Sequence, residues 1–488
     1  MKDFKYYLDK SGEVGYVDRF VHSVCYVQGL PHAHPGEVVM FEQGGWGQVL
    51  SLEGDGVEVL LLSEDKLIAG SQVARTGEFA KIGVSNALLG RLVDPLGNPL
   101  DNLKAINFKE ERLIDSPPPE MTLRREVNKP FETGVSLVDL IVPLSKGQRE
   151  LVIGDRKTGK SQFLLQSVLS QASRGTVCVY AIIGQRSVEI LRIGDFLREK
   201  GIQGNCILVA TSSSDPAGLI YLTPYTAMTI AEYFRDQGMD VLLVLDDLTT
   251  HARYYREVSL LARRFPGRNS FPGDIFYVHA RLLERAGNFK KGSITCLPGA
   301  ESILGDLSGY IQTNIMAMTD GHIFFDIDLY NQGRRPAVNP FLSVTRVGHQ
   351  TQTPLFREAS QILSSFLVEF DRMRQFMHFG AEVGENVKKT LDRGEKLMAI
   401  LNQQGFSIIP LPVTITLVGM LWAGFWNDLG IDEVKWQTEQ IVLNYRTNEN
   451  YKKSIESLVN GKGTFEEFIN ALRYDESAVM QGINVKKQ

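Results

Sequence analysis

The octapeptide GDRKTGKS, at Gly154–Ser161, decides the fold of this chain. It fits the pattern G-x-x-x-x-G-K-[ST], a loop whose backbone surrounds nucleotide phosphates. Gly154 and Gly159 allow the tight turn that points successive N–H groups into one concavity suited to an anion. Lys160 adds positive charge where the β- and γ-phosphates lie, and the hydroxyl of Ser161 is a ligand for Mg²⁺.

The flanking residues place this loop between a strand and a helix. Leu151–Ile153 is a short apolar run that predicts a buried strand, and residues 162–169 predict a helix whose N-terminus faces the phosphates. The alternative is an ordinary glycine-containing turn before a helix. Strand, loop and helix follow in the required order, which favours the phosphate-binding interpretation.

Length and composition set the class of protein. The 488 residues predict about three domains, and 43% hydrophobic with 22% charged residues is typical of a soluble globular chain. A net charge of −5 counts against a nucleic-acid binder. The start of the chain mixes both charges, which does not indicate a signal peptide. We expect the cysteines to be free thiols in a reducing compartment, because they are scattered without a C-x-x-C pair: Cys25, Cys178, Cys206 and Cys296.

One uncharged segment, Phe406–Trp426, approaches the length of a membrane span. Pro410 and Pro412 interrupt its start, and the flanking region is charged and helical. These features favour a buried helix over a span.

The pattern along the chain predicts a β-barrel at 1–73, an α/β P-loop nucleotide-binding domain of the RecA type at 74–352, and an α-helical domain at 353–488. Barrel strands are predicted at Val21–Val27, Glu37–Phe41, Gly47–Leu52 and Val57–Leu62. Buried, largely parallel strands are predicted at Cys178–Ile183, Cys206–Ala210, Val241–Leu245 and Ile315–Met318. A stripe at helical spacing predicts core packing: Leu363, Phe366, Leu367, Phe370, Met373 and Met377.

Two pairs of polar side chains are expected to be ordinary surface residues rather than functional sites. His32 and His34 lie in a loop with no third metal ligand near in sequence. Glu382 and Glu385 indicate a solvated face at a turn or helix end.

A P-loop needs a second acid for Mg²⁺ at the end of a neighbouring strand, and Asp246, after Val241–Leu245, supplies it. Hydrolysis needs a group that orients or deprotonates water. The strand after the P-loop helix ends in Gln185, a neutral amide, and Glu189 lies about one helical turn further on. The residues therefore indicate Mg-nucleotide binding more strongly than hydrolysis. Arg346, taken alone, indicates only a surface or salt-bridge residue.

Together these residues resemble the alpha subunit of F-type ATP synthases, over nearly the whole chain from about Gly15. The motifs are specific: GDRKTGKS, IGQRS, LDDLTTHARYYREVSLLARRFPGRNSFPGDIFYVHARLLERA, MTDGHIFF and GRRPAVNPFLSVTRVG. Three of them, GDRKTGKS, IGQRS and GRRPAVNPFLSVTRVG, are similar to alpha rather than to the catalytic beta subunit. Beta-type chains, and related secretion and flagellar export ATPases, carry Glu where this chain has Gln185.

The resemblance implies a subunit that alternates with beta-type catalytic subunits around a gamma-type shaft, on the cytoplasmic side of a membrane. ATP synthesis or hydrolysis there is coupled to proton or sodium transport. Mg-ATP or Mg-ADP would occupy a non-catalytic site, with Mg²⁺ held by Ser161 and Asp246. Arg346 would be an arginine finger acting in trans on the beta subunit's site. The loop Phe265–Asp274 would line the bearing around the shaft. Further nucleotide contacts would come from Gly154, Asp155, Arg156, Lys157, Thr158, Gly159, Lys160, Gln185, Arg335 and Gln403.

This chain departs from the family pattern in several places. Few residues precede the barrel, where alpha subunits usually have a helix that contacts the peripheral stalk, which counts against ordinary attachment to that stalk. Ala317 replaces a Ser that in many alpha subunits faces the catalytic phosphate site, and Gly405 replaces a second adenine-site Gln. The apolar run Pro412–Trp426 is expected to mark an unusual partner surface.

Two competing functions stay open on the sequence. The chain could be a self-sufficient homohexameric ATPase of the secretion or flagellar export type, with Arg346 acting on an identical neighbour and Glu189 replacing the missing base. It could also be an RNA-translocating hexamer, although its acidic balance counts against that function.

Overall fold

The computed structural model describes residues 3–54, 56–63, 67–378, 384–403 and 405–481. The chain divides into two compact units. The first unit spans 1–126, 147–153 and 171–319, and the second spans 127–146, 154–170 and 320–488. Each is described by itself.

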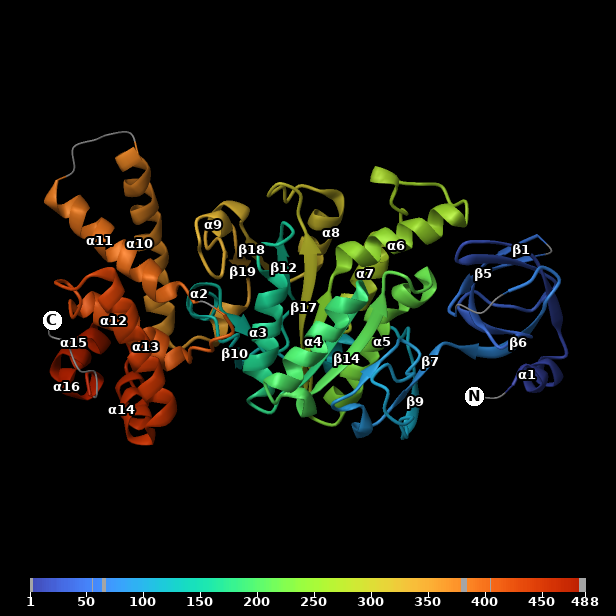
Figure 1. Ribbon diagram of the computed structural model, residues 1–488, viewed down its shortest axis with the longest axis horizontal. Helices are drawn as coiled ribbons and strands as arrows, with labels where there is room; N and C mark the ends of the chain where they lie inside the picture. The colour runs from blue at the N-terminus through green and yellow to red at the C-terminus, as the bar shows by residue number, and fades with distance from the viewer. Residues whose placement is uncertain (1–2, 55, 64–66, 379–383, 404, 482–488) are drawn as a thin grey trace. The chain divides into compact units, whose positions relative to one another are not determined.

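Six antiparallel strands of the first unit close a small barrel in the order β1-β2-β5-β4-β3-β6 (Figure 1). Its core is apolar and includes Val39, Phe41 and Val59. Gly47 leaves room for this core, because a Cβ there would lie 2.3 Å from the Val59 side chain. The strands are β1 Val14–Val21, β2 Val24–Gln28, β3 Glu37–Phe41, β4 Trp46–Glu53, β5 Gly56–Leu61 and β6 Gln72–Phe79.

The barrel confirms the predicted fold class and corrects one strand. The run Val21–Val27 is not one strand, since a turn at His22 and Ser23 separates β1 from β2. A short helix, α1 (Phe4–Ser11), precedes the barrel, and its Lys10 ammonium donates to the Thr76 carbonyl over 3.1 Å. The last barrel strand continues past residue 73, and the domain boundaries themselves stay predictions.

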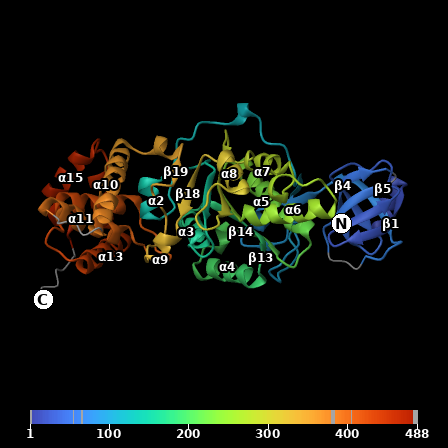
Figure 2. The same cartoon turned by 90° about the horizontal axis from the view of Figure 1, so that it is seen from above.

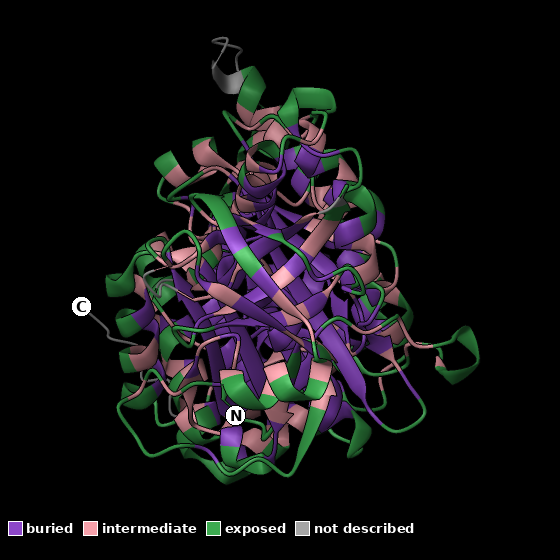
Figure 3. Ribbon diagram, turned by 90° about the vertical axis from the view of Figure 1, so that its right-hand side faces the viewer, coloured by how far each residue is buried: buried purple, intermediate pink, exposed green. Residues whose placement is uncertain are grey.

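Parallel strands form the central sheet of the first unit, with β17, β15, β13, β14 and β8 as neighbours in that order. Its middle strands are almost wholly buried (Figure 3), and helices α4, α5 and α6 pack against them (Figure 2). The buried strands predicted at Cys178–Ile183, Cys206–Ala210 and Val241–Leu245 are confirmed. The elements are β8 Leu92–Val93, β13 Val177–Gln185, β14 Cys206–Ser212, β15 Asp240–Asp246, β17 Ser293–Glu301, α4 Ser187–Glu199, α5 Ala217–Asp236 and α6 Leu248–Leu261.

The prediction of a strand at Ile315–Met318 is wrong, because these residues end helix α8. The buried members Ile311, Ile315 and Met318 lie on one helical face, a spacing that a four-residue apolar window cannot reveal. The remaining elements of this unit are β7 Lys81–Val84, β9 Glu110–Leu113, β16 Gly287–Asn288, α7 Ile275–Leu283, α8 Tyr310–Met318, η1 Asn86–Leu88, η2 Met121–Leu123, η3 Gln203–Asn205 and η4 Arg268–Ser270.

The second unit joins the phosphate-loop region to the C-terminal helices. Strand β12 (Glu150–Gly154), whose residues 150–153 belong to the first unit, ends at Gly154, the first residue of the phosphate loop, and α3 (Lys160–Ala172) follows the loop. Its other elements are β10 Pro130–Phe131, β11 Leu144–Ser145, β18 Gly321–Phe325, β19 Val344–Thr345, η5 Gly348–Thr351, α2 Ser136–Ile141, α9 Ile327–Asn331, α10 Pro354–His378, α11 Glu385–Leu401, α12 Leu411–Ala423, α13 Ile431–Thr447, α14 Glu449–Val459, α15 Phe465–Tyr474 and α16 Glu476–Val479.

Helix α12 forms the core of the helical domain. Pro410 is its N-cap and Pro412 lies in its first turn, where the missing N–H has no helical partner to lose. A Cβ at Gly419 would lie 2.5 Å from Leu472, so the glycine allows α15 to approach closely. Residues 413–421 are all buried. The buried-helix prediction is confirmed, and the expectation that this run forms a partner surface is wrong for those residues.

The structure also gives the burial of the other side chains named in the sequence analysis. Leu363, Leu367 and Phe370 of the α10 stripe are buried, Phe366 and Met373 are half-buried, and the side chain of Met377 is outside the described residues. Glu385 is exposed, and Glu382 is also outside them. His32 and His34 are exposed, and the four cysteines are free and buried. In the described part of the chain, no helix is long and apolar enough to cross a membrane.

Candidate functional site

The phosphate loop of the second unit has the backbone shape that its glycines predict. Gly159 has φ +100°, which an L side chain rarely adopts, and Lys157 also has a positive φ of 64°. A Cβ on Gly154 would lie 2.3 Å from the carbonyl oxygen of Phe325. Gly154 is therefore required for the close approach of two chain segments, and Gly159 for the turn itself.

The ammonium group of Lys160 lies inside the loop. Its Nζ donates to the carbonyl oxygens of Gly154 and Asp155, both over 2.7 Å. The Thr158 hydroxyl also donates to Asp155, over 2.7 Å, and closes the turn. The loop thus holds a positive charge beside the N-terminus of α3, where the helix dipole and backbone N–H groups favour an anion. Arg156, Lys157 and Ser161 are exposed on the same loop.

A narrow cleft adjoins this loop in the second unit. Its walls come from the phosphate loop and α3, the residue before α2, the segment after α9 and the segment after α11. The lining residues are Val135, Thr158, Gly159, Gln162, Phe163, Gln166, Arg335, Pro336, Ala337 and Gln403. The free volume is about 20 Å³, enough for about one water molecule. A nucleotide base at this position requires the walls to move apart.

Gln403 is buried in this cleft, and its side-chain amide is hydrogen-bonded to other groups of the protein. Its Oε1 accepts from the Ser136 N–H over 3.0 Å, and its Nε2 donates to the carbonyls of Gly134, over 2.7 Å, and Ser407. This side chain therefore caps the first turn of α2 and shapes the cleft. A base contact by Gln403 would have to replace one of these bonds, and that contact stays a prediction.

The guanidinium of Arg335 also has partners. It donates to the carbonyls of Tyr330 and Arg334 over 2.8 Å and 2.7 Å, and it lies 3.6 Å from the centroid of the Tyr330 ring. The backbone of Arg335, which precedes a cis proline, lines the cleft. Its contact with phosphate or base stays a prediction.

Acidic residues end strand β15 in the first unit. Asp246 is buried, and its Oδ2 accepts from the Tyr180 hydroxyl over 2.9 Å. The Asp247 carboxylate accepts from the Thr250 N–H over 2.7 Å and begins α6. Burial, and then the charge of Asp246, raise the pKa of Asp247 to about 6. Asp246 is thus positioned by Tyr180, whereas Asp247 has a capping role. The joint holding of Mg²⁺ by Ser161 and Asp246 stays a prediction.

The strand that carries Gln185 ends without a base. Gln185 is half-buried at the end of β13, and its carbonyl accepts from the Ser213 N–H over 2.9 Å. Glu189, in the first turn of α4, lies 3.7 Å from Arg186 and 3.4 Å from Arg192. The carboxylate nearest in sequence to Gln185 is therefore ion-paired with two arginines.

Comparison with known families agrees with this architecture. The nucleotide-binding domain of the ATP synthase alpha/beta family matches residues 134–345, and the C-terminal domain of the ATP synthase alpha/beta chain matches residues 352–475. The chain belongs to the ATP synthase alpha/beta family. It is therefore a nucleotide-binding subunit of a multisubunit rotary ATPase. The family match does not separate alpha from beta chains.

In this family member, Arg346 is exposed on a firmly held segment. Its N–H donates to the Asp320 carbonyl over 3.0 Å, and the neighbouring Thr345 hydroxyl donates to the Pro143 carbonyl over 3.0 Å. A Cβ on Gly348 would lie 1.6 Å from that same carbonyl, so the segment lies directly against it. Among the described residues, no carboxylate pairs with the Arg346 guanidinium.

Sequence reasoning missed several cleft residues of the ATP synthase alpha/beta subunit. Gln162 and Gln166 project from α3 toward the cleft, and their amides donate to the carbonyls of Gly405, over 3.1 Å, and Ser407, over 2.6 Å. Their spacing of four residues directly after the P-loop was the available signal. Ala317 is exposed on α8, so no side-chain hydroxyl is presented there.

Proposed function

We propose that this chain is the alpha-type, non-catalytic subunit of a rotary, ion-coupled ATP synthase or ATPase. It binds Mg-ATP without turning it over, and it supplies Arg346 to the catalytic site of a beta-type neighbour. The observation that carries the proposal is the end of β13, where Gln185 is neutral and Glu189 is paired with two arginines. At the end of β13, the described residues therefore offer a neutral amide where hydrolysis would need a base to activate water.

The roles of the chain's own residues in binding follow from the loop geometry. Phosphate oxygens would take the place of the Gly154 and Asp155 carbonyls as acceptors for Lys160, while the first-turn N–H groups of α3 bind the same phosphates. Mg²⁺ prefers oxygen ligands, and the Ser161 hydroxyl and the Asp246 carboxylate are groups of that kind. When bound, the ion neutralises phosphate charge. Tyr180 keeps the Asp246 carboxylate oriented for this role.

Arg346 suits action on a neighbouring subunit. A guanidinium placed beside the developing charge of a transferring phosphoryl group accelerates related reactions by about 10³–10⁵. Such a residue must be held firmly and keep its donors available. Exposure of Arg346, its lack of a carboxylate partner among the described residues, and the hydrogen bonds of Arg346 N–H and Thr345 to neighbouring carbonyls support this role.

The proposed partners are beta-type catalytic subunits and a gamma-type shaft, on the cytoplasmic face of a membrane, with proton or sodium transport coupled to ATP. Phe265, in the loop 265–274, is 98% exposed, which supports a contact with another chain. Phe271 anchors the loop, since its ring lies 4.7 Å from the Arg256 guanidinium and 6.2 Å from the Tyr310 ring. Attachment to an ordinary peripheral stalk is not part of the proposal.

Reconstitution tests this assignment against a homohexameric motor. The purified chain and a beta-type chain from the same source are assayed separately and mixed, by light scattering for assembly and by phosphate release for hydrolysis. We expect steady hydrolysis by a mixed oligomer that exceeds the rates of both separate chains. A homohexamer of this chain that hydrolyses ATP without a partner would overturn the proposal.

A further inference from the structure

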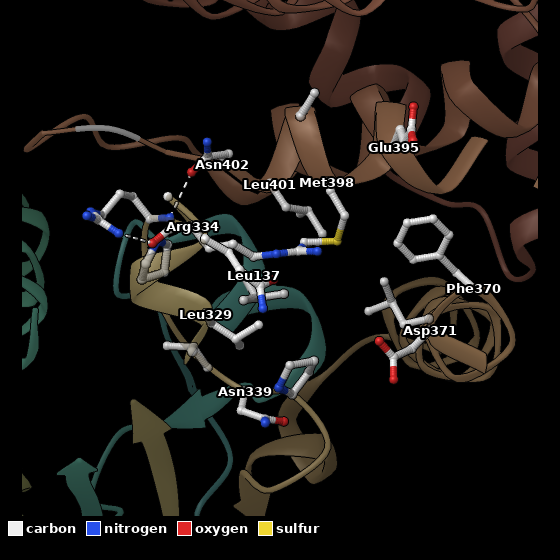
Figure 4. Close-up of a pocket in the computed structure, with 18 of the residues that line it drawn as sticks. Leu137, Leu329, Arg334, Asn339, Phe370, Asp371, Glu395, Met398, Leu401 and Asn402 are labelled. Carbon is white, nitrogen blue, oxygen red and sulfur yellow. Dashed lines mark hydrogen bonds between the residues drawn. The ribbon is translucent and has the colours of Figure 1, made fainter. Parts of the chain in front are cut away.

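A second cavity in the second unit has no role in the proposed function. Its volume is about 420 Å³, within the range of sites for small organic ligands. It lies between the residues around α9 and the helices α10 and α11 (Figure 4). Leu329, Leu367, Phe370, Met398 and Leu401 contribute apolar walls.

The side chain of Arg334 is directed into this cavity. Among the described residues, its guanidinium makes no hydrogen bond or ion pair, while its neighbour Arg335 is bonded to carbonyls. Figure 4 shows Arg334 entering the cavity with Met398 and Leu401 of α11 nearby and Asp371 of α10 across it. A half-buried guanidinium with unused donors is costly unless an acceptor satisfies it.

The charges around Arg334 favour an anion. Arg374 also lines the cavity, and it donates to the Gln332 side chain over 3.2 Å. Burial, and then the charge of Arg374, lower the pKa of Arg334, while Asp371 acts in the opposite direction. The guanidinium remains protonated at neutral pH. In all, four basic and two acidic residues line the cavity: Arg334, Arg335, Arg374 and Lys435 with Asp371 and Glu395.

We propose that this cavity is a binding site for a small phosphate monoester that carries an apolar ring system. Arg334 and Arg374 both line the cavity, and guanidinium groups match the planar, bidentate hydrogen bonding of a phosphate group. The aliphatic and aromatic walls accept the ring. The net positive charge of the lining suits a dianion. The site is separate from the P-loop, whose residues do not line it.

The binding test uses 1-naphthyl phosphate as the probe, with 1-naphthol and inorganic phosphate as its two halves. Titration of the full chain is followed by naphthyl fluorescence or calorimetry, with and without excess Mg-ATP. We expect saturable binding of the probe that ATP does not displace, and binding of either half that is at least about tenfold weaker. Absence of binding, or displacement by ATP, would show that the cavity is not the site.

Substitutions in and near the cavity test whether the probe binds there. Arg334→Gln is expected to weaken binding at least about tenfold, and Met398→Trp, which fills the cavity without a change of charge, to abolish it. Asp371→Asn removes a carboxylate beside the anion and is expected to tighten binding. Arg372→Gln, an exposed arginine on the same helix α10, is the matched control and should bind normally.

A measurement of thermal stability distinguishes a loss of binding from a loss of folded structure. Removal of one of two like charges should leave the unfolding midpoint of Arg334→Gln within about 2 °C of the parent. Equal affinity of the parent, Arg334→Gln and Met398→Trp for the probe would overturn the proposal. Weaker binding by Asp371→Asn would do the same.

Discussion

The backbone N–H of Gln403 donates to the carbonyl oxygen of Arg335 over 2.6 Å. A second bond joins the same segments, from the Arg335 N–H to the Asn402 side chain over 2.8 Å. Arg335 and Pro336 line both the cleft beside the P-loop and the cationic cavity. These two bonds therefore fix the wall that separates the two sites.

Substitution of Gln403 tests how much this wall depends on one side chain. Gln403→Ala removes the acceptor of the Ser136 N–H, a buried donor at the start of α2. An unsatisfied buried donor costs about 1–3 kcal/mol, so we expect a loss of that size in the free energy of unfolding. The carbonyls of Gly134 and Ser407 keep other donors, including Gln166.

Urea denaturation of Gln403→Ala and Gln162→Ala measures this difference. The Gln162 side chain is half-buried, and among the described residues its amide donates to the Gly405 carbonyl alone, so its loss is expected to cost about 0.5 kcal/mol. Equal stability of the two variants would show that the Gln403 amide does not hold α2 to the wall.

Two glycines give opposite predictions for the same change. Gly154→Ala brings a Cβ against the Phe325 carbonyl, and overpacking of this kind costs about 1–3 kcal/mol. Gly194→Ala, inside α4, meets no atom within 4 Å and is expected to stabilise the chain by about 0.5–1 kcal/mol. Thermal unfolding of both variants checks the pair, and stabilisation by Gly154→Ala would contradict the close approach of the two segments.

The sequence predicted those parts of the fold that local patterns encode. Buried strands such as Val241–Leu245 are continuous apolar runs, and the P-loop has a fixed spacing of glycines. Ile315–Met318 was missed because a short apolar run suits a strand or a helix equally, and only contacts with the rest of the chain decide between them. The turn at His22 was missed because it carries neither glycine nor proline.

Side-chain partners at the site were less predictable. Nothing in the sequence shows that the Gln403 amide accepts a hydrogen bond from the first residue of α2, or that Glu189 is ion-paired with two arginines. The cavity around Arg334 could not be predicted from the sequence either, because its walls come from segments far apart in the chain. Such contacts depend on tertiary structure, which one sequence does not display.

A buried histidine pair predicts a dependence of stability on pH. His251 Nδ1 lies 3.1 Å from His279 Nε2, and burial lowers the pKa of His251 to about 4. A histidine in the unfolded chain has a pKa of about 6.5, so between about pH 4 and pH 6.5 the unfolded chain binds more protons than the folded chain. Stability from this group is complete above about pH 6.5 and falls as pH drops toward 4, by about 2 kcal/mol between pH 7.5 and pH 5.

Comparison with His251→Gln isolates this contribution. Asp247 acts in the opposite direction, since its raised folded pKa of about 6 favours the folded state on acidification. It is common to both proteins, so it cancels in the difference. Urea denaturation at about pH 7.5 and pH 5 should show a smaller loss in the variant. An identical loss in both proteins would contradict a neutral buried His251.

Arg346→Ala tests the arginine finger in the complex with a beta-type partner. We expect hydrolysis to fall by about 10³-fold, because the transition-state charge loses its guanidinium. Arg346→Lys should recover only part of the rate, since a lysine lacks the planar fork. Nucleotide affinity of the chain alone should not change. Arg372→Ala is the matched control, and full activity of Arg346→Ala would remove the finger assignment.

The central claim is that this subunit binds Mg-ATP and does not hydrolyse it. The direct measurement is calorimetric binding of Mg-ATP and steady-state phosphate release in one sample of the purified chain, beside Lys160→Ala and the exposed control Lys453→Ala. We predict binding by the parent and the control, weaker binding by Lys160→Ala, and the same negligible turnover in all three. Turnover by the parent that Lys160→Ala abolishes and Lys453→Ala retains would contradict the claim.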